Sequence, residues 1–348
     1  MAAQAPNSLV GRTVEGRYRI DALLGEGAVG AVYRVLELST GRVLALKRWT
    51  ASALDAQVRG RFLRETNALD TLDHPNIVKV FGHGVVDGVP YMVLEYLEGQ
   101  TVEELLHEGE PLEVELAIDI ARQALSAIAY AHLHNVVHRD LKPENIFLTK
   151  QAGGRPCVKI LDYGLAKFMA PTGDSTKDKT LTMAGMVVGT PLYMPPEQAA
   201  GGSVDLPVDV YAMGCVLFEM LTGRLPFEAE SRLELLTAHL RDPIPRLENV
   251  RHGLPVAPAL QELIDRALAK KQTERYPHAG AMLAALESVP THPIVAADDR
   301  SLHDAAGPPA SHARPPTSRE AGLRRRSWLL LVGVALLVAV GLVVQLMR

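Results

Sequence analysis

The sequence predicts an α+β fold with two lobes, a small strand-rich lobe followed by a larger helical lobe, and one more apolar helix near the end of the chain. Three observations predict it. Short strand-like runs occupy residues 18–97, and apolar residues at helical spacing dominate from about residue 101 to 288. An unbroken run of apolar and glycine residues then extends from Trp328 to Val344.

Composition places the chain among ordinary globular proteins and excludes several other classes. Of its 348 residues, 47% are hydrophobic and 22% are charged, which excludes a collagen-like, fully disordered or disulfide-stapled chain. The formal net charge of −4 provides no overall attraction to nucleic acid, so we expect no nucleic-acid partner. The only cysteines, Cys157 and Cys215, fit no metal-ligand spacing and are expected to be buried, reduced thiols.

Five short runs predict the strands of the first lobe, because they combine alternation with β-branched and aromatic residues. They are Tyr18–Leu24, Gly30–Leu36, Val43–Arg48, Val78–Gly84 and Tyr91–Tyr96. Residues 1–17 are expected to be a flexible N-terminus, which leaves a folded body at 18–288 with lobes at 18–97 and 98–288. Within the second lobe, Leu112–His132 and Val208–Leu221 have the clearest helical patterns.

A glycine-rich segment lies between the first two predicted strands. It reads Leu24-Gly25-Glu26-Gly27-Ala28-Val29-Gly30. A Gly-x-Gly-x-x-Gly string alone also occurs in dinucleotide sites and in plain glycine turns. A dinucleotide site continues into a helix, whereas the alternating residues after Gly30 favour a strand. Glycines at such a hairpin tip allow backbone amides to approach phosphate oxygens.

Lys47, at the end of a predicted strand, is either a solvated edge residue or a cation for the α- and β-phosphates of a nucleotide. Glu65 in the following segment helps to choose between them. It falls on the helical face marked by Leu54, Val58, Phe62, Leu69 and Leu72. An inward carboxylate needs a partner, and Lys47 is the natural one; a Glu65 turned to the surface is the alternative.

The strongest local signal is the string His138-Arg139-Asp140-Leu141-Lys142-Pro143-Glu144-Asn145. Asp140 can accept a hydroxyl proton, Lys142 can neutralise a transferring phosphoryl group, and Asn145 offers an oxygen to a metal ion. Asp162, after the apolar run Val158–Leu161, supplies a second hard oxygen ligand that suits Mg²⁺. A zinc site built from His132, His134 and His138 is the competing hypothesis, and it lacks a nearby thiol.

Together these motifs resemble those of Ser/Thr protein kinases, and the chain is similar to the bacterial Hanks-type branch across residues 18–288. A glycine loop, a strand lysine, a helix glutamate, a catalytic loop, Asp162-Tyr163-Gly164 and Pro195-Pro196-Glu197 follow one another in the expected order. Tyr163 in place of Phe and Pro196 in place of Ala are mild departures. The resemblance implies the bilobal protein-kinase fold, ATP and Mg²⁺ as cofactors, and protein Ser/Thr hydroxyls as substrates.

The resemblance also implies roles for individual residues. Asp140 is the catalytic base, assisted by Lys142, Lys47, Glu65 and Thr190, and Asn145 and Asp162 hold Mg²⁺. Leu94 is the gatekeeper, and Glu95 and Leu97 present backbone groups to adenine. The expected ATP-binding residues are Leu24, Gly25, Glu26, Gly27, Ala28, Val29, Gly30, Val32, Ala45, Lys47, Leu94, Glu95, Leu97 and Leu148. Asp209 braces the catalytic loop, and Arg275 pairs with Glu197.

The segment between Asp162 and Glu197 is rich in hydroxyl groups. Arg139 provides a guanidinium that can pair with a phosphate there, so we expect autophosphorylation at Thr180 or Thr182. The plain alternative is a flexible polar loop. Thr190 is expected instead to hydrogen-bond Asp140 and Lys142.

The C-terminal region predicts a membrane anchor. Residues 289–326 are rich in Pro and Ala without periodicity, which is typical of a disordered linker. The apolar helix expected at 327–347 approaches the roughly 20 residues that span a bilayer. Because Arg324–Arg326 precede it, we expect a single pass through the inner (cytoplasmic) membrane with the body in the cytoplasm. We expect neither a cleavable signal peptide nor an external domain.

These observations lead to two functional hypotheses. The first is an ATP- and Mg²⁺-dependent Ser/Thr protein kinase, activated by autophosphorylation within a possible homodimer on the membrane. The second is a pseudokinase scaffold that recruits partners to the membrane. A scaffold predicts damage to at least one of Lys47, Asp140, Asn145 and Asp162, and all four are intact.

Overall fold

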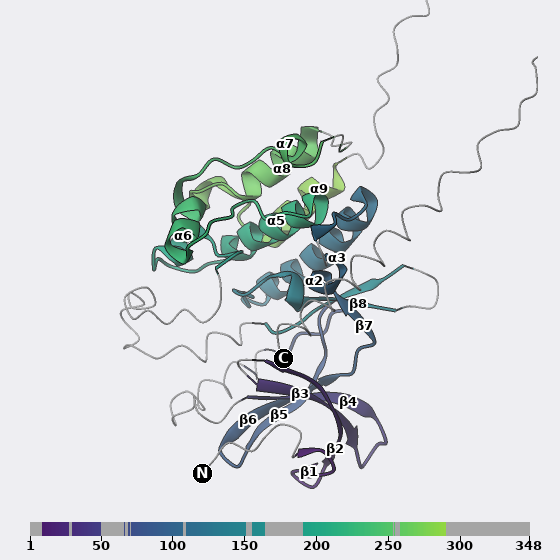
Figure 1. Ribbon diagram of the computed structural model, residues 1–348. Coiled ribbons are helices and arrows are strands. Elements are labelled where there is room, and N and C mark those ends of the chain that lie inside the picture. The colour runs from purple at the N-terminus through teal and green to yellow at the C-terminus, as the bar shows by residue number, and fades with distance from the viewer. Residues whose placement is uncertain are drawn as a thin grey trace, which may run out of the picture. The chain divides into compact units, whose positions relative to one another are not determined.

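The structure is a computed structural model, shown as a ribbon in Figure 1. It describes residues 9–27, 30–49, 66, 69, 71–106, 109–150, 155–163, 191–252, 254 and 258–289. The chain divides into two units, one at Met1–Ile294 and a second at Val295–Arg348. The described residues all belong to the first unit.

The first lobe is built on an antiparallel sheet with the strand order β1-β2-β3-β4-β6-β5 (Figure 1). Its strands are β1 Thr13–Val14, β2 Tyr18–Gly27, β3 Gly30–Glu37, β4 Val43–Trp49, β5 Val80–Val86 and β6 Val89–Glu95. Alternation along the strands gives the sheet two different faces. One face forms the core of the lobe, with Tyr33, Val35, Leu46 and Val93 each at most 1% exposed. The side chains of the other face, among them Ala45 and Lys47, lie outside this core.

The fold begins earlier than residue 18, which corrects the expected boundary of the flexible N-terminus. Residues Thr13 and Val14 pair with Arg19 and Tyr18, and Leu9 and Val14 are 7% exposed members of the core. Because only two apolar side chains anchor this segment, it has no periodic pattern that a sequence analysis could detect.

The second lobe is mainly helical (Figure 1). Its helices are α2 Val102–Leu105, α3 Val114–Leu133, α4 Pro196–Ala199, α5 Pro207–Thr222, α6 Arg232–Arg241, α7 Leu247–Val250, α8 Pro258–Ala267 and α9 Ala279–Glu287, with short 3₁₀ turns η4 Pro143–Asn145 and η7 Gln272–Glu274. Helix α5 has apolar residues on every face and is almost wholly buried against α3, α8 and α9. It starts with Pro207 at its first turn and ends at Gly223, whose φ of 71° suits the left-handed cap.

The second lobe also contains a small sheet, although its residues were expected to be helical from about residue 101. Strands β7 Gly99–Thr101, β8 Ile146–Thr149 and β9 Cys157–Ile160 pair antiparallel in the order β7-β8-β9. These strands are too short to show a strand period clearly. Gly99 is required there, because a Cβ at this position would lie 1.9 Å from the carbonyl oxygen of Leu148.

The expected anchor helix at 327–347 lies outside the described residues, and so does the expected linker after Val289. Val289 itself is described and is buried. Among the residues that the structure describes, no helix has both the length and the apolar character needed to cross a membrane.

Candidate active site

The open face of the first sheet carries the residues expected to surround a nucleotide. In the sheet register Lys47 lies opposite Val32 on one side and Met92 on the other, while Ala45 lies opposite Leu94. Directly opposed residues of an antiparallel pair point to the same face, and Ala45 and Lys47 are two residues apart. Their side chains therefore share one face, the one opposite the core of the lobe.

The glycines of the β2–β3 hairpin differ in what surrounds them. Apart from their chain neighbours, no described residue has an atom within 4 Å of the Cβ positions of Gly25 and Gly27, whereas a Cβ on Gly30 would lie 2.3 Å from the carbonyl oxygen of Arg48. Gly30 is therefore required by the packing of β3 on β4. Gly25 and Gly27 leave space in which a phosphate could reach the backbone. The tip residues Ala28 and Val29 lie outside the described residues.

Lys47 forms an ion pair with Asp162, with 2.5 Å between Nζ and Oδ2. The two side chains are 19% and 27% exposed, so the pair is half-buried yet accessible to a ligand. This contact joins the open face of the first sheet to the end of β9. Glu65, the partner that the sequence pattern favours for Lys47, lies outside the described residues.

The catalytic-loop residues converge around Asp140. The side-chain amide of Asn145 donates to the Asp140 carbonyl oxygen at 2.7 Å and to its Oδ2 at 3.3 Å. Lys142 Nζ lies 3.7 Å from the same Oδ2. The backbone N–H of Leu161 donates to the Asn145 carbonyl at 2.9 Å, which places Asp162 beside Asn145. One carboxylate, one amide and one ammonium are thus assembled at the mouth of the site.

Asp209, in α5, braces this loop. It is 1% exposed and accepts hydrogen bonds from the backbone N–H groups of His138 and Arg139, both at 2.8 Å, and contacts His132 Nε2 at 2.9 Å. Burial opposes its ionisation, but the hydrogen bond with His132 and the nearby histidines outweigh burial, so the pKa of Asp209 is lowered.

This brace holds strained backbone. Arg139 has a φ of 65°, a left-handed conformation that is unfavourable for a residue with a long side chain. The two hydrogen bonds to Asp209 fix that conformation immediately before Asp140. The Arg139 Nε is buried without a hydrogen-bond partner among the described residues. The described residues therefore leave this nitrogen of the guanidinium without an acceptor.

A second buried ion pair fixes the segment that ends the hydroxyl-rich region. Arg275 is 2% exposed, and its two terminal nitrogens each lie 2.7 Å from an oxygen of Glu197. Its Nε donates to the Ala269 carbonyl at 2.7 Å. The pair that the resemblance implies is therefore present, and it ties α4 to the loop before α9.

The histidines do not form the alternative zinc site. His132 contacts Asp209, His138 Nε2 contacts the Leu161 carbonyl at 2.8 Å, and His134 Nδ1 contacts the Tyr130 carbonyl at 2.8 Å. Within the described ranges, no group of three His, Cys, Asp or Glu side chains could hold a metal ion. Tyr163 is 4% exposed, and its ring packs 4.7 Å from that of His138.

The expected adenine residues surround the join between the two sheets. Ala45 and Leu148 are 8% and 6% exposed, while Leu94 and Leu97 are half-buried and Leu24 is 46% exposed. The N–H of Glu95 donates to the Lys79 carbonyl at 2.9 Å, so this amide is already engaged within the protein. The side chain of Glu95, for which the sequence predicts no role, pairs with Lys159.

Thr180, Thr182 and Thr190 lie outside the described residues, so their expected roles stay predictions. Conversely, sequence reasoning missed His132 as a partner of Asp209 and Lys159 as a partner of Glu95. No local pattern indicates either contact, because each joins residues more than sixty positions apart. Cys215 is buried as expected, whereas Cys157 is only half-buried.

The residues present fit Mg²⁺ and a nucleoside triphosphate. Asn145 uses its amide nitrogen on Asp140, and no described residue donates a hydrogen bond to its Oδ1, which is the atom a hard cation would take. Asp162 provides a carboxylate and Lys47 an ammonium at the same place. The open space over Gly25 and Gly27 leaves their backbone accessible to phosphate oxygens.

Comparison with known proteins identifies the family. The family described as "Protein kinase domain" matches residues 18–286. The chain is 40% identical over 282 residues to the serine/threonine-protein kinase pkn3 of Myxococcus xanthus, covering 80% of this chain and 51% of that protein. It is 36% identical to PknB of Mycolicibacterium smegmatis, covering 91% of this chain and 52% of that protein.

Solved structures agree with this assignment. The crystal structure of the Mycobacterium tuberculosis PknI kinase domain aligns with a TM-score of 0.61 at 26% identity, covering 80% of this chain and 97% of that one. The chain spans about half the length of the curated relatives it matches. Since the family match covers most of both lobes, which have the bilobal kinase architecture, the chain belongs to the protein kinase family.

Proposed function

We propose that the protein is a Ser/Thr protein kinase that transfers the γ-phosphoryl group of ATP to protein hydroxyls with the help of Mg²⁺. The single observation that carries this proposal is the convergence of Lys47, Asp140, Asn145 and Asp162 on one accessible site between the two sheets. The relatives named as serine/threonine-protein kinases support the choice of Ser/Thr hydroxyls. Nothing in the described residues favours a pseudokinase scaffold.

The chain's own groups divide the chemistry among them. Mg²⁺-ATP, when bound, supplies the phosphoryl group and neutralises phosphate charge. Lys47 is placed to orient the α- and β-phosphates, and Asn145 and Asp162 are placed to hold the cation. Asp140 orients the substrate hydroxyl and accepts its proton, while Lys142, 3.7 Å from it, stabilises negative charge that develops on the transferring group.

Phosphate transfer to a generic Ser/Thr protein substrate tests this function. The wild-type chain should transfer labelled phosphate from ATP in the presence of Mg²⁺. Asp140→Asn should reduce kcat by about 10²- to 10⁴-fold, the range typical of a lost general base, and Lys47→Met should reduce kcat/KM to a similar degree. Asp73→Asn, which changes an exposed carboxylate outside the site, is the matched control. A folded wild-type chain without transfer would contradict the proposal.

We further propose that the kinase is activated by autophosphorylation at Thr180 or Thr182. The support is the Arg139 guanidinium beside Asp140, whose Nε has no hydrogen-bond partner among the described residues. Phosphosite mapping of wild type and Asp140→Asn should find modified threonine only in the active protein. An unmodified segment in a fully active enzyme would contradict activation by this route.

Membrane attachment completes the proposal. The apolar run Trp328–Val344, preceded by Arg324–Arg326, supports a single-pass anchor in the inner membrane with the kinase on the cytoplasmic side. Confinement to a membrane raises the local concentration and so favours phosphorylation between two copies. Deleting residues 327–348 should move the protein to the soluble fraction, and persistence of the truncated chain in the membrane pellet would contradict the anchor.

A further inference from the structure

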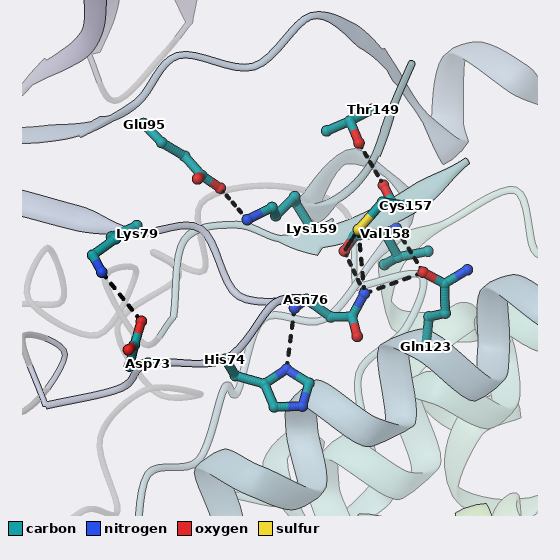
Figure 2. A network of polar contacts seen from close by, with 10 residues as sticks. All are labelled: Asp73, His74, Asn76, Lys79, Glu95, Gln123, Thr149, Cys157, Val158 and Lys159. Carbon is teal, nitrogen blue, oxygen red and sulfur yellow. Dashed lines mark hydrogen bonds and ion pairs between the residues drawn. The ribbon is translucent and has the colours of Figure 1, made fainter. Parts of the chain in front are cut away.

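An ion pair joins the two lobes at the end of strand β6 of the first sheet. Lys159 Nζ lies 2.6 Å from Glu95 Oε1, and the two side chains are 17% and 22% exposed (Figure 2). They belong to different sheets and are 64 positions apart in sequence. The pair therefore connects β6 of the first lobe with β9 of the second.

The two partners sit on segments with different expected tasks. Glu95 ends β6 and opens the segment 95–97, whose backbone is expected to contact adenine. Lys159 lies on β9, three residues before Asp162, which is expected to hold Mg²⁺ and already contacts Lys47. The ion pair thus links the adenine end of the nucleotide site to its phosphate and metal end.

Strand β9 is the fixed member of this link. Its outer edge is held by side chains: Asn76 Nδ2 donates to the Val158 carbonyl at 2.9 Å, and the Val158 N–H donates to Gln123 Oε1 at 3.0 Å (Figure 2). The Ile160 N–H donates to the Asn76 carbonyl at 2.8 Å. Its other edge pairs with β8. The backbone under Lys159 is therefore anchored from both sides.

The segment that follows Glu95 is held less firmly. Glu95 ends its strand opposite Leu44 of β4 and its N–H donates to the Lys79 carbonyl at 2.9 Å, but the next residues, Tyr96 and Leu97, belong to no strand or helix. A partly open cavity of about 210 Å³ lies beside the ion pair, lined by His74, Lys79, Glu95 and Lys159 among others. No tightly packed wall of described residues therefore fixes Glu95 from that side.

We propose that Lys159 is a positioning residue for the nucleotide: its ion pair with Glu95 transmits the fixed position of β9 to the adenine-binding segment and so sets the spacing between adenine and metal. This inference rests on the proposed function, because it assigns a role within that nucleotide site. Losing the pair should weaken nucleotide binding while leaving Asp140, Lys142 and Asn145 in place. The signature is a change in KM for ATP without a matching change in kcat.

The neighbouring ion pair supplies a matched control. Lys79 Nζ lies 3.2 Å from Asp73 Oδ1, but these side chains are 54% and 83% exposed and only six positions apart (Figure 2). Exposed pairs of this kind contribute little, and this one does not connect the two lobes. Lys79→Met therefore removes the same charge from the same surface without breaking the link.

The experiment compares Lys159→Met, Glu95→Gln, Lys159→Arg and Lys79→Met in steady-state phosphate transfer and in direct titration with ADP. Lys159→Met and Glu95→Gln should each raise KM for ATP and Kd for ADP by about 3- to 10-fold, the effect expected for one half-buried contact between charged groups, with kcat within about twofold of wild type. Lys159→Arg, which keeps the charge, should restore most of the affinity. Lys79→Met should match wild type.

Hydrogen exchange at the Glu95 amide provides a readout that needs no activity. If Lys159 positions this segment, Lys159→Met should exchange faster at this amide than both wild type and Lys79→Met. Unchanged affinity and unchanged exchange in Lys159→Met would overturn the proposal, and so would a rise in kcat with KM unchanged. A wild-type chain without phosphate transfer would refute the proposed function, while the exchange rates would still decide whether Lys159 positions the segment.

Discussion

The two halves of the candidate site are built in opposite ways. In one half, the catalytic-loop half, the loop rests on buried polar groups: Asp209 is 1% exposed and His138 is 0% exposed, and the hydrogen bonds that Asp209 forms with the loop and with His132 are 2.8–2.9 Å long. In the other half, the hairpin half, the glycine hairpin is exposed, and Gly25 and Gly27 have open space around them. The catalytic-loop half is therefore fixed before any ligand binds, and the hairpin half has room to change its conformation.

This difference teaches where each half contributes. Groups that meet the reacting hydroxyl must be held in place for the transition state, so a rigid base under Asp140 favours turnover. Groups that cover phosphates must admit and release a nucleotide, so an open hairpin favours exchange of ligand. Changes in the catalytic-loop half should thus affect both folding and kcat, and changes at the exposed glycines of the hairpin half should affect KM alone.

The largest effect on stability and activity should come from removing the Asp209 carboxylate that holds the catalytic loop. Asp209→Ala leaves the N–H groups of His138 and Arg139 and the imidazole of His132 without their buried acceptor. We expect a loss of about 3–5 kcal/mol in the free energy of unfolding and a further fall in kcat per folded molecule. Urea denaturation and phosphate transfer measure the two effects, and a stable, fully active variant would refute the division between the halves.

The same aspartate predicts a pH dependence. Its pKa is lowered in the folded protein, so the ionised form stabilises the fold at pH values above its ordinary pKa of 3.8, and this stabilisation is lost as the pH falls through the lowered value. Asp209→Asn should remove this part of the acid sensitivity. Denaturation curves at several acidic pH values check it, and identical pH dependence in both proteins would contradict it.

A smaller but still large loss of stability should follow from breaking the buried ion pair between Arg275 and Glu197 in the catalytic-loop half. Arg275→Ala leaves Glu197 without its bidentate partner and should destabilise the fold by about 3 kcal/mol, whereas Arg275→Lys keeps the charge but not the fork and should cost less. Lys271→Met breaks an exposed pair with Glu274 nearby and should cost less than about 1 kcal/mol. Equal losses in thermal unfolding would show that burial does not set the difference.

In the hairpin half, Gly27 and Gly30 should respond differently to substitution by alanine. Gly30→Ala places a methyl group against the Arg48 carbonyl and should cost about 1–3 kcal/mol of stability. Gly27→Ala has space for the methyl and should leave the free energy of unfolding almost unchanged, while raising KM for ATP several-fold with kcat intact. Chemical denaturation with ATP titration of both variants separates the effects, and a kcat defect in Gly27→Ala would contradict the comparison.

The smallest effect concerns His74, which lies beside the link between the halves. Burial lowers the pKa of His74, and the positive charge of Lys159 lowers it further. Lys159→Met removes that charge, so the pKa of His74 should rise, whereas Lys79→Met should leave it unchanged. An NMR titration of the imidazole measures the shift, and a fall or no change in Lys159→Met would show that the cation does not act on this ring.

Much of the fold follows from the sequence because long, strongly patterned segments leave little choice. Helix α5 has apolar residues on every face and is almost wholly buried, and strand β3 alternates buried residues with more exposed ones. The small sheet escaped prediction because β7 has three residues, and β1 escaped it because it has two. In both, pairing with a distant strand decides the structure rather than the local pattern.

The site was predictable in its parts but not in its connections. The motif around Asp140 indicates which groups take part, since few other arrangements require that combination of residues. The sequence pattern favours Glu65 as the partner of Lys47, and it gives no signal for the contact between Lys47 and Asp162, which depends on how the two sheets come together. The Lys159–Glu95 pair had no signal at all, because neither residue stands out until the two sheets are brought together.

The central claim is that Lys47, Asn145 and Asp162 together form one site for Mg²⁺ and ATP. Calorimetric titration of the purified protein with ATP, with and without Mg²⁺, tests it most directly. The account predicts binding of one nucleotide that Mg²⁺ strengthens in wild type, and loss of this strengthening in Asp162→Asn. A well-folded wild type that binds no nucleotide, or an Asp162→Asn variant that responds to Mg²⁺ as wild type does, would contradict it.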